Sequence, residues 1–209
     1  MPFVQSTLEK QAAHKAGQSA GVAKRVLAAS QNTIQGAGDQ LALRSQLPTI
    51  AGAALASGTA YWVYVGRAAE KIAAARVRAY VTSAGAGAQT AEVAVATSAT
   101  PPNGAAQALT VVAVSGSLDA LTATGTKGCS ADLAVAIDPS SYVWVGIRTA
   151  MATTQPSVQG HTMDCLNGEC LSTAAAGVLA VGTSYAGALI ADSVAWQAPA
   201  LFLTVTQTS

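Results

Sequence analysis

Charged side chains are scarce in this sequence. They make up 10% of its 209 residues, against roughly a quarter in an average globular protein. Thr, Ser, Gln, Gly and Ala must therefore cover most of the surface that faces water. So little surface charge is typical of a subunit that other chains cover in an assembly, and the alternative is a monomer with a surface rich in Thr and Ser.

The few basic residues are not arranged as in a nucleic-acid-binding protein. The formal net charge is only +1, and the first fifty residues contain a single aromatic side chain, Phe3. Nucleic-acid-binding proteins usually combine basic clusters with aromatic residues. We therefore expect no nucleic-acid partner.

Long apolar segments are also missing. The first thirty residues lack the continuous apolar core of a signal peptide, so we expect synthesis in the cytoplasm. Residues 171–191 carry no charge, but they contain several Gly, Ser and Thr residues, and no Lys or Arg flanks them. This pattern favours two strands joined by a Gly-rich turn and predicts no membrane partner.

Groups for acid–base catalysis are few and scattered. The only two histidines are His14, in a predicted helix, and His161, in a predicted strand, and no orienting partner is evident for either. Residues 17–21 match the G-x-S-x-G pattern of serine hydrolases, but they fall inside the predicted helix, whereas that motif requires a preceding strand. The sequence predicts a protein that is not an enzyme and has no cofactor.

The three cysteines are too few for a metal cluster. Cys165 and Cys170 flank Asn167-Gly168, the preferred pair for a two-residue hairpin turn, which would place the two sulfurs opposite each other. That spacing allows either a disulfide or two packed thiols, and both remain open at this point. His161 with both sulfurs gives only three neighbouring ligands, so we predict no metal site. Cys129 is expected to be buried and inert.

Strand patterns dominate from Ser57 onward. The segment 141–151 reads SYVWVGIRTAM, and an earlier segment, AYWVYVGRAA, echoes it; both look buried on two faces. Ten strands are predicted, each bounded by turn residues: 59–66, 76–82, 90–97, 107–115, 133–137, 142–151, 158–166, 169–173, 178–185 and 201–206. The predicted fold class is all-β, a β-sandwich of the jelly-roll type over residues 51–209, preceded by a helical arm and linker over residues 1–50.

The arm is predicted to contain one helix, residues 7–29, which begins at a capping box formed by Ser6 and Glu9. Small and apolar residues recur along one face at helical spacing. Such a face buries little area alone but allows another backbone to approach closely. We therefore take it as the candidate assembly interface, with the residues Leu8, Ala12, Ala16, Ala20, Ala23 and Leu27.

Four segments carry a resemblance to a known group of proteins: GTAYWVYVGR, GAGAQTAEVAV with the Pro-Pro-Asn turn after it, YVWVGIRTAMATTQPSV, and WQAP before the last strand. From Ala60 to Leu203 the sequence resembles small β-sandwich proteins that are structural components of tailed bacteriophage particles. The resemblance implies a capsid decoration (cement) or head-fibre protein, with a tail-fibre or baseplate adaptor as the alternative.

With this resemblance, we expect a non-enzymatic homotrimer located in the virion. Its partners would be the phage major capsid protein or other virion proteins. A carbohydrate-binding module is the competing class, because four aromatic residues could stack on sugars: Trp62, Tyr64, Trp144 and Trp196. These aromatics lie in apolar runs, which favours burial in the core over an exposed platform.

Overall fold

The computed structural model describes residues 33–34, 38–41, 49–87, 89–116, 119–129, 131–161, 169–175, 177–190 and 198–208. Within these ranges the protein is all-β: it contains fifteen strands and one short 3-10 helix, η1 (Asp119–Thr122). The predicted helix at residues 7–29 lies outside the described residues. In the same ranges no helix is long and apolar enough to cross a membrane.

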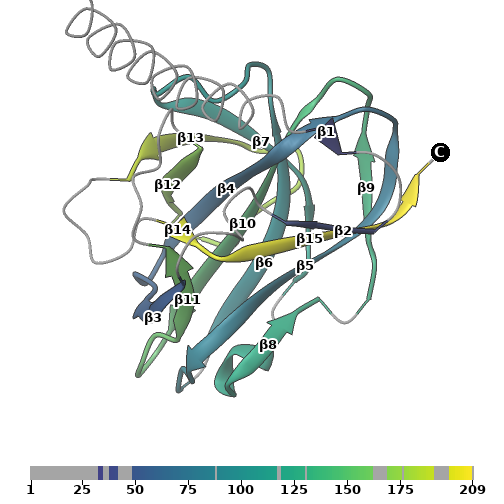
Figure 1. The fold of residues 1–209 in the computed structure, drawn as a ribbon. Helices are drawn as coiled ribbons and strands as arrows, with labels where there is room; N and C mark the ends of the chain where they lie inside the picture. The colour runs from purple at the N-terminus through teal and green to yellow at the C-terminus, as the bar shows by residue number, and fades with distance from the viewer. Residues whose placement is uncertain are drawn as a thin grey trace, which may run out of the picture.

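Six antiparallel strands close into a barrel (Figure 1). Their order around the barrel is β4 (Thr59–Ala68), β10 (Tyr142–Met151), β6 (Gln89–Ser98), β7 (Gln107–Val114), β13 (Ser184–Leu189) and β12 (Cys170–Ala174). The ring is completed because β12 pairs with β4, over Cys170↔Val63 to Ala174↔Thr59. Closure removes the free sheet edges that an open sheet would leave.

A second sheet lies against one wall of the barrel. Its strands follow the order β14 (Ala198–Pro199), β11 (Ser157–His161), β5 (Ile72–Ser83), β15 (Leu201–Thr208) and β2 (Gly38–Leu41). Three more strands attach to it: β3 (Thr49–Ala54) pairs with β11, and both β8 (Gly125–Gly128) and β9 (Leu133–Ile137) pair with β5. The two-residue β1 (Thr33–Ile34) runs parallel to β4.

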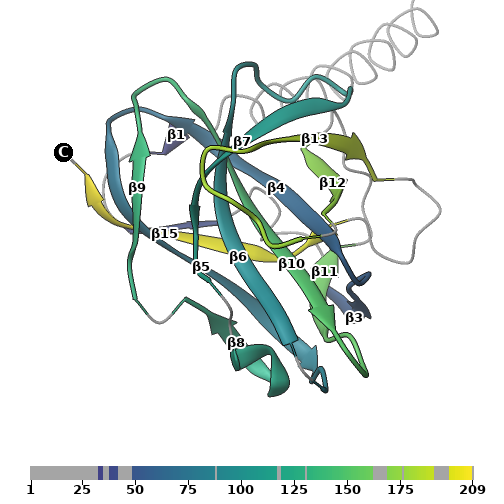
Figure 2. The ribbon, with the colours of Figure 1, turned by 180° about the vertical axis from the view of Figure 1, so that it is seen from behind.

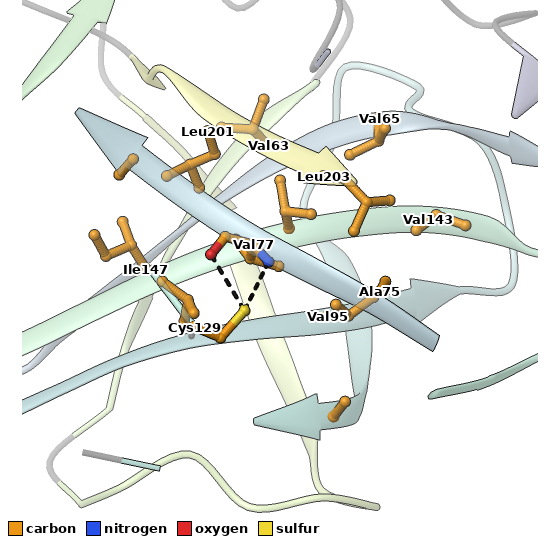
Figure 3. Packing of buried hydrophobic residues seen from close by; sticks show 14 of the residues in the cluster. Val63, Val65, Ala75, Val77, Val95, Cys129, Val143, Ile147, Leu201 and Leu203 are labelled. Atoms are coloured by element: carbon orange, nitrogen blue, oxygen red, sulfur yellow. Dashed lines mark hydrogen bonds between the residues drawn. The ribbon is translucent and has the colours of Figure 1, made fainter. Parts of the chain in front are cut away.

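Alternation of side chains along the barrel strands produces two apolar cores. One face of β4, β6 and β10 packs against β5 and β15, mainly through Val, Ile and Leu (Figure 3). The opposite face of the same strands points into the barrel, where the core is built from aromatic, Leu and Ala side chains. This explains why both faces of 141–151 are apolar: each one faces a different core.

Most predicted strands are confirmed, and several segments differ, among them Thr49–Ala54, which forms β3 although no strand was predicted there. The strands at 133–137 and 142–151 have the predicted bounds. The strand predicted at 178–185 is wrong, because residues 177–183 form a connecting segment and β13 begins only at Ser184. Residues 125–128 were predicted as a turn but form β8. Two short strands, β1 and β2, also lie within the segment predicted as a linker.

Candidate functional site

The structure tests only part of the predicted sites. The predicted assembly stripe lies outside the described residues, as does Cys165, so the pairing of Cys165 with Cys170 stays a prediction. Cys170 itself is buried at the start of β12 and is disulfide-bonded. The side chain of His161 is not among the described ones, and in the described part of the chain no group of three or more His, Cys, Asp or Glu residues could hold a metal ion.

The aromatic residues considered for sugar binding fill the barrel. Trp62, Tyr64 and Trp144 are each 0% exposed and belong to the interior core. The rings of Tyr64 and Trp144 are 5.3 Å apart between centroids and tilted by 59°, a usual geometry for an aromatic pair. The Trp144 Nε1–H donates to Ser98 Oγ at 2.9 Å. Core burial is thus confirmed for these three residues, while Trp196 lies outside the described residues.

Two polar atoms in this core are unusual. Among the described residues neither Trp62 Nε1 nor the Tyr64 hydroxyl has a hydrogen-bond partner, although both are buried. Burial raises the pKa of the Tyr64 hydroxyl well above its usual value, and the nearby Tyr142 and Glu169 raise this pKa further. The Tyr64 hydroxyl therefore keeps its proton at neutral pH in the folded protein, and it is held in the core without a partner among the described residues.

A buried ion pair links two neighbouring strands of the barrel, β10 and β6. Arg148 on β10 and Glu92 on β6 are only 2% and 3% exposed, and Arg148 Nη1 lies 3.5 Å from Glu92 Oε2. Arg148 Nε also donates to the carbonyl oxygen of Ala175 at 2.9 Å. Glu92 Oε2 in turn accepts the backbone N–H of Leu179 at 3.0 Å. Both charged side chains thus form hydrogen bonds with the backbone of the segment between β12 and β13.

This ion pair was not predicted from the sequence. A signal was present, because alternation along 141–151 places Arg148 on the same face as Trp144 and Gly146. A charge on that face must be buried if the strand is buried on both sides, and a buried charge needs a partner. The identity of the partner could not be read from sequence, since Glu92 lies 56 residues away.

The free thiol of Cys129 lies beside β5, at the interruption between its pairing with β8 and its pairing with β9. Cys129 Sγ accepts the backbone N–H of Val77 at 3.0 Å and lies 3.4 Å from the carbonyl oxygen of the same residue, to which the thiol donates (Figure 3). This position falls between the stretches of β5 that pair with β8 and β9. Burial raises the pKa of the Cys129 thiol. The prediction that this cysteine is buried is confirmed.

Strands β7 and β13 lie side by side in the barrel wall (Figure 2), and their exposed side chains near the pairing are small and uncharged. Residue pairs across these strands are small: Ala186 lies opposite Ala108, and Ser184 lies opposite Thr110. All four are exposed. Because the side chains are short and carry no charge, the backbone of another chain could approach this face closely. We call this surface, formed by Ala108, Thr110, Ser184, Ala186 and Ala188, the alanine face.

No protein-family model, no curated protein and no solved structure matches this chain.

Proposed function

We propose that this chain is a non-enzymatic structural protein of a tailed-phage virion, a capsid decoration or cement protein that forms a homotrimer. The proposal starts from the resemblance of residues 60–203 to such proteins. The observation that carries it further is the alanine face, because its exposed residues are small and uncharged. Charged residues are depleted in the cores of subunit interfaces, so an uncharged face of this kind is compatible with contact with other subunits.

The distribution of bulky side chains supports the same proposal. The large aromatics Trp62, Tyr64 and Trp144 are used inside the barrel, so they cannot form a platform for sugars without unfolding. Most exposed positions in the described structure are Ala, Thr, Ser or Gly. Binding energy would then come from many small apolar contacts spread over several copies. We retain a jelly-roll sandwich as the proposed classification of the barrel and the sheet packed on it.

The helical arm and linker of residues 1–50 would attach the protein to its partner, the phage major capsid protein or another virion protein, through the part that precedes β1, residues 1–32. Deleting residues 1–32 leaves β1 and β2 in place, and these strands pair with β4 and β15. We expect the shortened protein to fold but no longer to sediment with phage heads. Binding of the full chain should depend weakly on salt, because apolar burial is not screened whereas exposed charges are screened within about 10 Å at 0.1 M salt.

The test is cosedimentation of the purified full chain with tailed-phage particles that lack it, followed by mass measurement of the free protein. Binding to heads and a mass three times that of the 20.7-kDa chain would support the proposal. Binding only to tails would support the alternative, a tail-fibre or baseplate adaptor. Failure to bind either, with a monomeric mass, would overturn the proposal.

A substitution on the alanine face tests the role of this surface separately from that of the rest of the molecule. Ala186→Glu places a charge on the proposed contact surface and should abolish trimer formation or particle binding. Ala134→Glu is the matched control, because Ala134 is also exposed but lies on β9 of the second sheet. Equal effects of both changes would show that the alanine face has no special role.

A further inference from the structure

The segment that joins β12 to β13 passes over one end of the barrel. Residues 177–183, here called the strap, include Leu179, whose side chain is buried in the interior core and only 4% exposed. Its neighbours Val178 and Val181 point outward and are 59% and 63% exposed. The strap therefore inserts one residue into the barrel and displays two on the surface.

The two halves of the strap are held by different interactions. Near its start, Arg148 Nε holds the carbonyl oxygen of Ala175 and Glu92 holds the N–H of Leu179. At its end, Gly182 N donates to the carbonyl oxygen of Val111 at 2.8 Å, and Val111 N donates to that of Thr183 at 3.0 Å. The start of the strap is thus held by buried side-chain charges, and its end continues the backbone pairing of β13 with β7. Between them, the N–H of Ala180 donates to the Tyr185 hydroxyl at 3.2 Å, and the carbonyl oxygen of Ala180 accepts the N–H of Thr183 at 3.2 Å.

We propose that the strap is a closure of the barrel that opens locally, and that the buried pair Arg148–Glu92 is its latch. Releasing Leu179 from Glu92 frees the start of the strap as far as Ala180, whose N–H donates to the Tyr185 hydroxyl at 3.2 Å, without breaking any pairing of β13. Gly182, with φ of 80°, lies at the turn that separates the part of the strap that would move from the part that stays paired with β7. Few backbone bonds hold the strap, so its opening requires less free energy than global unfolding.

The chemistry of the buried pair Arg148–Glu92 favours a role in holding the strap closed over a role in stabilising the whole fold. A buried ion pair usually stabilises a fold no more than well-packed apolar residues would, but losing one partner leaves an uncompensated buried charge. Here both charges are also tied to backbone groups of the connection between β12 and β13. An open strap would withdraw Leu179 from the aromatic core that contains Trp62 and Tyr64, whose Nε1 and hydroxyl have no partner among the described residues.

Amide hydrogen exchange at low urea concentrations tests the proposal on the full chain. In the wild type, we expect amides of the strap to exchange at a rate that changes little with urea, whereas amides of β6 and β10 should exchange at rates that rise steeply with urea. Local opening exposes little surface, and global unfolding exposes much. Glu92→Gln should speed strap exchange at least tenfold and keep its weak urea dependence.

The matched control is Asp132→Asn, which removes the exposed ion pair between Arg76 and Asp132 and should leave strap exchange unchanged. If Glu92→Gln does not fold, Arg148→Lys keeps the charge but not the planar guanidinium and should speed strap exchange by a smaller factor. Strap amides that exchange with the rate and urea dependence of the barrel strands in every variant would overturn the proposal. So would a strap rate that neither latch variant changes.

Fluorescence gives an independent readout of the opening. In a Trp196→Phe background only Trp62 and Trp144 remain of the three tryptophans. Acrylamide should quench them weakly in the closed protein and more strongly after Glu92→Gln. Faster strap exchange without any increase in quenching would show that the strap moves without opening the barrel, which contradicts the proposed closure.

Discussion

Gly146 lies directly opposite Trp62 in the ladder between β10 and β4, and a Cβ atom on residue 146 would overlap the indole ring. The absence of a side chain at Gly146 gives the six-membered part of the Trp62 indole room inside the barrel. The closed barrel is narrow, so the largest side chain in it requires the smallest residue on the neighbouring strand. A pair of this kind fixes how the interior core is packed.

Gly146→Ala should therefore destabilise the protein. The added methyl group forces the indole or the strand to move, and overpacking of this kind typically costs about 1–3 kcal/mol. The free energy of unfolding from urea titration measures the effect. Gly177→Ala is the control, because a Cβ at residue 177 meets no atom within 4 Å, and it should change stability by less than about 0.5 kcal/mol. Equal losses in both variants would contradict the packing argument.

Removing the Tyr64 hydroxyl should not destabilise the fold. The hydroxyl is buried without a partner among the described residues, and an unsatisfied buried polar group costs about 1–3 kcal/mol. We expect Tyr64→Phe to raise the free energy of unfolding by about 1 kcal/mol. In the control, Tyr185→Phe, the lost hydroxyl accepts the N–H of Ala180 at 3.2 Å, so stability should fall. A clear loss in Tyr64→Phe would show that an ordered water or another group binds this hydroxyl.

Stability should fall in alkaline solution. The folded-state pKa of Tyr64 is raised above the value of about 10 that Tyr has in an unfolded chain. As the pH rises above about 10, the unfolded state loses the proton and the folded state keeps it, so the free energy of unfolding decreases. The contribution is fully present below pH of about 10. Urea titrations at several alkaline pH values measure it, and Tyr64→Phe should show a shallower decrease than the wild type.

Cys129 should resist alkylation in the native protein. The residue is 8% exposed, and burial raises the pKa of its thiol, so the reactive thiolate is rare at neutral pH. Iodoacetamide should label it slowly in buffer and rapidly in denaturant, as measured by mass spectrometry. Because Cys170 is disulfide-bonded, Cys129→Ser should remove the described site of labelling. Rapid labelling of the native wild type at Cys129 would contradict its position between β8 and β9.

The strands and the buried aromatics could be predicted from the sequence. The bounds of β9 and β10 match the prediction because alternation and turn residues are local signals. The burial of Trp62 and Trp144 also followed from the apolar runs around them. The strand predicted at 178–185 failed for a nonlocal reason: the N–H of Leu179 is taken by Glu92 from a distant strand, 87 residues away, so the local apolar pattern did not decide the structure there.

The sequence by itself determined that this chain forms strands and that the aromatic residues in its apolar runs, Trp62 and Trp144, avoid water, because both depend on residue type and short-range periodicity. Only the tertiary structure decided that β12 pairs with β4 and closes a barrel, that Arg148 meets Glu92 inside it, and that the alanine face remains exposed. These features depend on which strands become neighbours. That choice rests on the packing of the whole chain, since many strand orders satisfy the same alternation.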